Sequence, residues 1–187
     1  EACLSCHKDA DEGMKFVHGP SAAGACDSCH LSHKSNFRKL LTIEGNELCF
    51  DCHRDMRRQL AQANVVHKPV EGNCLDCHDP HSSNFTMQTK AAPADLCLSC
   101  HQADMRTALA GKHKHSVVTN DQACINCHTS HGSQLADLMK DEPINICMQC
   151  HSKPQQAPDG RKVAGVPEVN DPKLIKHGPI RDGNCSG

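Results

Sequence analysis

The stretch "GNCLDCHDPHSSNF" at residues 72–85 holds two cysteines three positions apart, a histidine directly after the second, and another histidine three residues later. The pattern C-x-x-C-H occurs seven times in the 187 residues and uses all but one of the fifteen cysteines. Its cysteines are Cys3, Cys6, Cys26, Cys29, Cys49, Cys52, Cys74, Cys77, Cys97, Cys100, Cys124, Cys127, Cys147 and Cys150. Its histidines are His7, His30, His53, His78, His101, His128 and His151. A histidine after every pair is too regular for chance, so it belongs to the motif.

The composition leaves little material for an ordinary hydrophobic core. The chain has four Phe and neither Tyr nor Trp, and ten Pro and twelve Gly interrupt long helices and strands. Because so few bulky apolar groups cannot offset the conformational entropy of folding, bound groups are expected to fill the interior. The formal net charge of −2 gives no sign of nucleic acid binding. No run of 18 apolar residues predicts a transmembrane helix.

The motif itself indicates which group is bound, because C-x-x-C-H is the attachment sequence of c-type haem. Two thiols one turn apart can form thioethers with the porphyrin, and the imidazole that follows binds the iron. Zinc sites and redox disulfides also use C-x-x-C pairs, but neither requires a histidine after every pair. The sequence therefore predicts seven haem c groups, with the motif cysteines as thioether sites and the motif histidines as axial ligands.

The motifs alternate between two kinds. Opening motifs carry a second histidine three residues after the first, and closing motifs lack it. This alternation predicts a half unit at 1–17, two-haem units at 18–66, 67–112 and 113–176, and the start of a further unit at 177–187. The segment "KHGPIRDGNC" at 176–185 repeats "VHGPSAAGAC" at 17–26. Cys185 is therefore interpreted as the first cysteine of an eighth motif in a longer protein.

Eight histidines lie outside the motifs and are candidates for the second axial ligand. They are His18, His33, His67, His81, His113, His115, His131 and His177. His113 is interpreted as the spare one, because His115 keeps the 14-residue distance from the preceding motif histidine that His67 also shows. Methionine ligation is a minor alternative, since histidines are not lacking.

Two schemes pair these histidines with irons. His33, His81 and His131 follow their own motif histidine too closely to reach round the same porphyrin, so they are predicted to bind the iron of another motif. For the remaining histidines, pairing with the preceding motif is preferred because it completes the count within the chain. That scheme gives His7/His18, His53/His67, His101/His115 and His151/His177. Pairing each with the motif that follows is the alternative.

On these motifs, the sequence resembles the multihaem c-type cytochromes built from paired C-x-x-C-H motifs, over residues 1–151 and again over 176–185. The resemblance implies a mostly irregular, elongated fold with short α-helices and little or no β-sheet, wrapped around a chain of haems. Helices are expected over 47–62 and 95–110, where a closing motif runs into a charged amphipathic tail. Residues 152–176 are predicted to form a Pro-rich surface loop.

The resemblance implies electron transfer in respiratory or extracellular electron transport, and no enzyme activity. Iron with two imidazole ligands has no open position for a substrate. The expected partners are redox proteins or other cytochromes, and the expected location is periplasmic or extracellular, because this haem attachment follows export. Two alternatives remain open: a subunit of an extracellular cytochrome filament, or a multihaem reductase of nitrogen or sulfur oxyanions, which needs an open iron.

Overall fold

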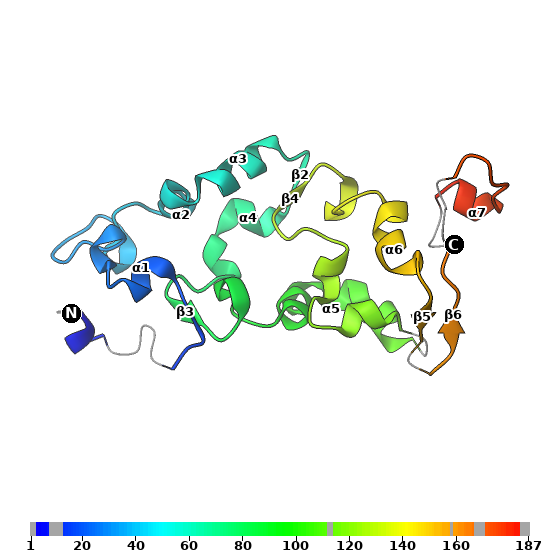
Figure 1. Cartoon of the computed structure of the whole chain (residues 1–187). Coiled ribbons are helices and arrows are strands. Elements are labelled where there is room, and N and C mark those ends of the chain that lie inside the picture. The colour runs from blue at the N-terminus through cyan, green and yellow to red at the C-terminus, as the bar shows by residue number, and fades with distance from the viewer. Residues whose placement is uncertain (1–2, 8–12, 112–113, 158, 167–170, 184–187) are drawn as a thin grey trace.

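A computed structural model describes the chain except for residues 1–2, 8–12, 112–113, 158, 167–170 and 184–187. The molecule is elongated, and its short helices follow one another along the long axis from the N-terminal end to α7 (Figure 1). The α-helices are α1 (Gly19–Ala22), α2 (Asn46–Cys52), α3 (Arg54–Gln62), α4 (Lys68–Gly72), α5 (Pro93–Ala110), α6 (Pro143–His151) and α7 (Gly178–Arg181). Short 3-10 helices cover Cys3–Ser5, Cys26–Ser28, Arg38–Leu40, Cys74–Asp76, Thr86–Gln88, Ser116–Thr119, Ala123–Asn126 and Ala136–Leu138. The prediction of a mostly irregular fold with short helices is confirmed.

The closing motifs of the three full units lie on the longer helices, but they interrupt these helices to different degrees. The helix expected over 47–62 is broken, because His53 adopts φ −85° and ψ 53° and so separates α2 from α3. In α5 the chain bends less, since His101 keeps φ −95° and ψ 16° and the helix continues to Ala110. α6 instead ends at its motif histidine, His151. The residues after each motif histidine therefore lie differently in the three units.

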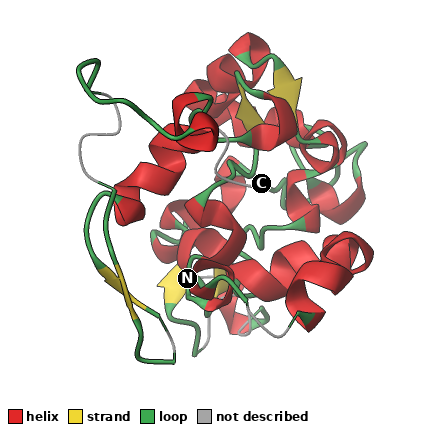
Figure 2. Ribbon diagram, turned by 90° about the vertical axis from the view of Figure 1, so that its right-hand side faces the viewer, coloured by secondary structure: helices red, strands yellow, loops and turns green. Residues whose placement is uncertain are grey.

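Three antiparallel sheets of two short strands each supply the β-structure of the described residues. β1 (Phe16–Val17) pairs with β3 (Ser82–Ser83), and β2 (Val65–Val66) pairs with β4 (Gly132–Ser133). In both cases, the strand just before one unit pairs with the loop after the opening motif of the next unit. By the predicted bounds, β1 belongs to the half unit 1–17 and β2 to the unit 18–66, so each sheet joins a unit to the second unit after it. Strands are a minor part of a fold dominated by helices and loops (Figure 2).

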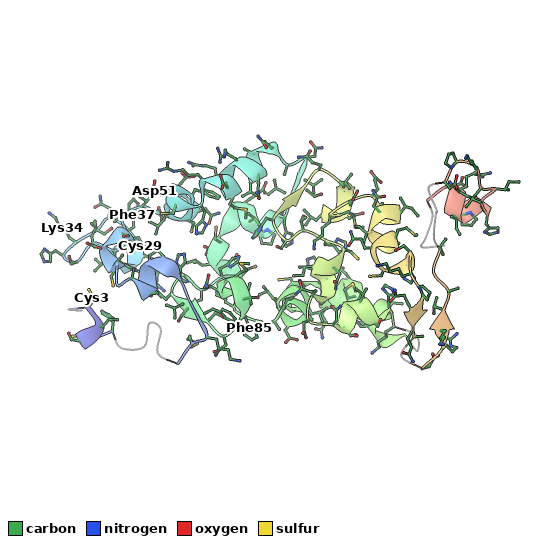
Figure 3. All side chains as sticks on the ribbon, viewed as in Figure 1. Cys3, Cys29, Lys34, Phe37, Asp51 and Phe85 are labelled. Carbon is green, nitrogen blue, oxygen red and sulfur yellow. The ribbon has the colours of Figure 1, made fainter. Side chains whose placement is uncertain are left out.

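The polypeptide buries very little of its own apolar surface. Among the described residues only Ala123 and Ile146 are buried hydrophobic residues, and Ser82 and Ser83 are the buried polar ones. The accessible surface is 14116 Å², whereas a compact domain of this mass exposes about 8,800 Å². Side chains project along the whole length of the ribbon rather than into one centre (Figure 3). The chain thus has the open, core-poor construction that its composition predicts.

The segment after the last closing motif is more ordered than the predicted loop. β5 (Gln155–Gln156) and β6 (Lys162–Val163) form a short hairpin within 152–176, and all four strand residues are exposed. The predicted surface loop therefore contains a short exposed hairpin. Within the described part of the chain, no helix is both long enough and apolar enough to cross a membrane.

Candidate functional site

Each opening motif is held in a single turn by a backbone hydrogen bond. The N–H of His30 donates to the Cys26 carbonyl over 2.9 Å, and that of His78 donates to the Cys74 carbonyl over 3.1 Å. The motif that begins at Cys124 has the same bond. Residues three and four apart share one face of such a turn. The two cysteines and the histidine therefore emerge together, as attachment to one porphyrin requires.

Five pairs of imidazole rings face each other in the structure. In every pair, one ring belongs to a C-x-x-C-H motif and the other to a histidine outside the motifs. The centroids lie 5.9–6.1 Å apart, and the ring planes differ by 15–25°. The pairs are His53 with His18, His30 with His81, His101 with His67, His78 with His131, and His151 with His115.

The separation of these rings fits two imidazoles bound to opposite sides of one metal ion. A metal–imidazole bond is about 2.0–2.1 Å long, so adding the distance from each nitrogen to its ring centre puts the two centroids about 6 Å apart. Aromatic rings that pack without a metal spread over centroid distances of about 4.5–7 Å. The narrow range in all five pairs is therefore the observation that fits haem iron between the rings.

The pairing differs from both schemes that the sequence suggested. His18, His67 and His115 face neither the motif before them nor the one directly after them, but the closing motif of their own unit. The preferred pairs His7/His18, His53/His67, His101/His115 and His151/His177 are therefore wrong. Strand pairing provides the physical reason.

Strand contacts hold two of these histidines, His18 and His67, against the following unit. His18 donates its backbone N–H to the His81 carbonyl over 2.8 Å, next to the β1–β3 sheet. His67 donates to the His131 carbonyl over 2.8 Å, next to the β2–β4 sheet. Each histidine is therefore fixed away from the motif that precedes it.

The second histidine of the later opening motifs behaves as predicted. His81 faces the motif histidine of the preceding unit, His30, and His131 faces His78. Each therefore lies against a motif other than its own. One imidazole pair thus lies within each unit, and another links each unit to the next.

Four predicted ligands have no imidazole facing them among the described residues: His7, His33, His128 and His177. They stay predictions of the sequence. His113 and Cys185, the proposed spare histidine and the proposed start of an eighth motif, lie outside the described residues.

Backbone carbonyls orient many of the paired rings. Nδ1 of His30 donates to the Lys39 carbonyl over 2.8 Å, and Nδ1 of His78 donates to the Met87 carbonyl over 2.9 Å. His128 makes the same contact with the residue nine positions later. Since Nδ1 carries the proton in these bonds, the lone pair of Nε2 is free to bind a metal.

The accepting carbonyls come from a left-handed turn that repeats in each unit. Lys39, Met87 and Asp137 have φ of 57°, 58° and 53°, and the residue after each also has a positive φ. Residues other than glycine reach this region only at a cost of about 1–2 kcal/mol each. None of these positions is a glycine, so this turn could not be predicted from composition. Its repetition at all three opening motifs indicates that orienting the imidazole outweighs the cost.

A serine stabilises the same loop in all three units. The hydroxyl of Ser83 donates to the Thr89 carbonyl and accepts the N–H of Phe85 over 3.0 Å. Ser35 and Ser133 make the equivalent contacts in the other two units. The serine stands two residues after the second histidine each time, so the spacing H-x-S is a sequence signal of this loop.

The cysteines of consecutive motifs lie next to one another. Cys49 and Cys74 share a side-chain hydrogen bond, and burial followed by this neighbour raises the pKa of the Cys49 thiol to about 11. Burial and then Cys124 raise the pKa of Cys97 to about 11 as well. The described residues contain no group of three or more His, Cys, Asp or Glu side chains placed to hold a metal ion. The contacts instead place the haem attachment points of neighbouring motifs side by side.

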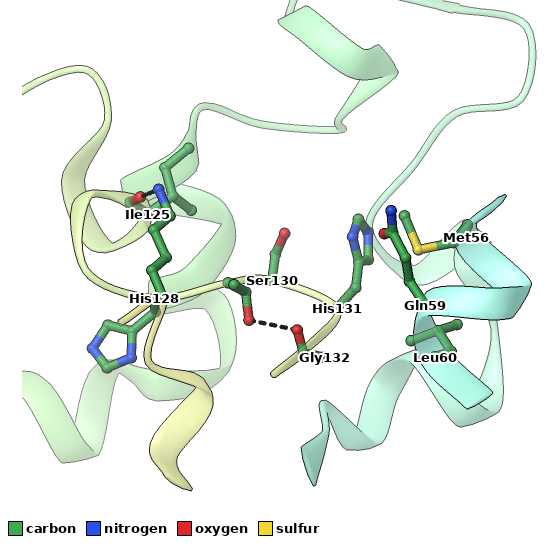
Figure 4. Close-up of a pocket in the computed structure, with 10 residues that line it drawn as sticks. Met56, Gln59, Leu60, Ile125, His128, Ser130, His131 and Gly132 are labelled. Atoms are coloured by element: carbon green, nitrogen blue, oxygen red, sulfur yellow. Dashed lines mark hydrogen bonds between the residues drawn. The ribbon is translucent and has the colours of Figure 1, made fainter. Parts of the chain in front are cut away.

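His131 is half-buried and lies near two other histidines. Burial lowers the pKa of its imidazole, and the positive charges that His78 and His67 would carry lower it further. A neutral imidazole is the form that binds a metal. A cavity of about 310 Å³ adjoins it, and Met56, Gln59 and Leu60 of α3 line the wall nearest to His131 (Figure 4). α3, which follows one closing motif, therefore packs around a ligand that belongs to a later unit.

Comparison with known families agrees with this geometry. The family model described as "Doubled CXXCH motif" matches residues 18–58, 67–106 and 115–156, more than half of the chain. The chain belongs to the doubled CXXCH motif family. It is a multihaem c-type cytochrome, and the three matched segments each contain one opening and one closing motif. A comparison with curated proteins found no match.

Proposed function

We propose that this multihaem cytochrome transfers electrons along a row of c-type haems, most of them held between two imidazoles. The observation that carries the proposal is the set of five imidazole pairs at 5.9–6.1 Å. Each bound haem would supply an iron that gains or loses one electron. Two imidazoles on one iron occupy both axial positions, which favours electron transfer over substrate binding at those five sites.

Contacts between cysteines of different motifs support a continuous row. The pKa of Cys29 is raised first by burial and then by Cys52 and Cys49, so the motif at Cys26 adjoins the next one. Cys49 contacts Cys74 in the following motif. In the next unit, Cys100 contributes to the raised pKa of Cys77 after burial and Asp76, and Cys97 shares a side-chain hydrogen bond with Cys124. Attachment points this near one another favour short distances between successive porphyrins from the second motif to the sixth.

Hydrogen bonds to the ligand rings support electron transfer because they limit the movement of these rings. Nδ1 of His18 donates to the Pro80 carbonyl over 2.8 Å, and Nδ1 of His67 donates to the Ser130 carbonyl over 3.0 Å. Each bond joins a ligand of one unit to the loop of the next. Ligands fixed in this way need little rearrangement when the charge of the iron changes. The chain therefore acts as a rigid holder in which neighbouring units position one another's ligands.

The proposal includes seven haems, one for each complete motif, and a location outside the cytoplasm, since thioether attachment of this kind follows export. Redox proteins or other cytochromes are the proposed partners. A row of haems is useful only where electrons enter at one site and leave at another. Both roles require partners that dock close to a porphyrin edge.

Intact mass spectrometry and a potentiometric titration together test the function. The protein should carry seven haems through denaturation, because thioethers do not dissociate, and its haems should be reduced reversibly over a broad range of potentials. The five paired irons should bind no carbon monoxide. Zinc in place of haem, or carbon monoxide bound at most of the irons, would refute the proposal.

A further inference from the structure

One motif histidine has a different hydrogen-bond acceptor from the others. Nδ1 of His101 donates to the carboxylate of Asp104, with 3.0 Å between Nδ1 and Oδ2. The opening-motif rings donate to neutral backbone carbonyls instead. Within the described part of the chain, no carboxylate makes this bond to the other closing-motif rings, His53 and His151. The iron site formed by His101 and His67 is therefore distinguished by a carboxylate that accepts a hydrogen bond from its ligand, since the Asp79 carboxylate lies 4.0 Å from Nδ1 of His81, too far for a hydrogen bond.

The course of the helix explains why this contact forms at only one closing motif. α5 continues through His101, so Asp104 follows one turn later on the same face. The corresponding position in the first unit is Met56, behind the break at His53, and in the third unit it is Pro154, beyond the end of α6. Among these three helices, only α5 combines an aspartate at this position with a helix that continues past its motif histidine, with a kink at His101.

We propose that Asp104 lowers the reduction potential of the iron held between His101 and His67, below that of the corresponding iron between His53 and His18. This inference rests on the proposed function. A carboxylate that accepts the Nδ1 proton makes the imidazole a stronger electron donor, and a stronger donor stabilises the oxidised iron. Asp104 acts through His101 and is a positioning residue. Reduction adds one electron to this iron and moves no proton.

The exposure of the contact determines the size of the effect. The Asp104 side chain is 73% exposed and that of His101 is 52% exposed. Water and salt therefore screen the charge of the carboxylate over distance. The hydrogen bond acts directly on one ligand, so the shift should be confined to one haem. A purely electrostatic effect would spread over the neighbouring haems as well.

Asp104→Asn in the haem-loaded protein tests the inference, because asparagine keeps the size of the side chain and removes its charge. The reduction potential of one haem should rise, and the low-spin electron paramagnetic resonance signal of one iron should shift. The matched control is Asp55→Asn. Asp55 also follows a closing-motif histidine and is exposed, but it pairs with Arg58 rather than with a ring nitrogen. This control should leave every potential and every signal in place.

The outcomes separate this inference from the proposed function. If Asp104→Asn binds the full complement of haem and shifts no potential, the role of Asp104 is refuted and the electron carrier remains. Equal shifts of several haems in Asp104→Asn and Asp55→Asn would also refute it, because they indicate a general surface charge effect. Loss of haem from the unmodified protein would refute the proposed function itself.

Discussion

Replacing His81 by alanine should open the coordination of an iron that another unit carries. The His81 ring faces His30 with 6.0 Å between centroids, whereas its own motif histidine, His78, faces His131. The substitution removes only the ring, because the backbone of residue 81 still donates to Asp79 over 2.9 Å. We therefore expect one additional haem of the seven predicted, about one seventh of the total, to become high-spin, and this haem should be the one attached at Cys26 and Cys29.

Carbon monoxide titration of the reduced protein measures this change directly. The His81→Ala variant should bind one molecule more than the unmodified protein, and a magnetic circular dichroism spectrum should lose one low-spin iron. His113→Ala is the control, since His113 is the one histidine outside the motifs that the sequence predicts to be no ligand. It should leave the number of low-spin irons unchanged. An equal loss in both variants, or a loss in His113→Ala alone, would refute the pairing rule.

Three further predictions concern the loops that hold the ligands, and each can be measured by denaturant unfolding of the haem-loaded protein. Gly132→Ala should destabilise the fold by about 1–3 kcal/mol, because a Cβ there would lie 3.0 Å from the Ala63 Cβ. Gly72→Ala is its control and should not destabilise the fold, because a Cβ at Gly72 would have no atom within 4 Å. Met87→Gly should stabilise the protein by about 0.5–1 kcal/mol, since the left-handed backbone suits glycine and the side chain is 77% exposed; a loss of stability would contradict this. Ser83→Ala should cost about 1–3 kcal/mol, because the buried hydroxyl bridges two backbone groups, and an unchanged midpoint would refute its role.

The sequence predicted the chemistry of the motifs because covalent attachment and axial ligation are local requirements. Two cysteines and a histidine must share one turn, so their spacing can be recognised in "CLDCH" without any knowledge of the fold. The scarcity of buried residues was predictable as well, because a chain with so few aromatic side chains is expected to fill its interior with bound groups. The break at His53 was not predictable, because α2, α3 and α5 have similar helical patterns and differ only in how the backbone turns at the motif histidine.

The pairing of the second ligands could not be obtained by counting. Both sequence schemes assumed that a histidine binds the iron of a neighbouring motif. The pairing of β1 with β3 instead holds His18 beside the loop that contains His81. Two-residue strands such as Phe16–Val17 leave no alternating pattern in a sequence, so the strand pairing that positions His18 could not be predicted. The left-handed turn at Lys39 could not be predicted either, because its backbone strain is offset only when the Lys39 carbonyl accepts the hydrogen bond from His30.

Near-infrared magnetic circular dichroism of the oxidised, haem-loaded protein tests the central claim most directly, because the charge-transfer band of low-spin ferric haem identifies both axial ligands. The five imidazole pairs predict at least five irons with the band of two histidines. Bands of histidine and methionine at these irons, or a spectrum dominated by high-spin haem, would contradict the account.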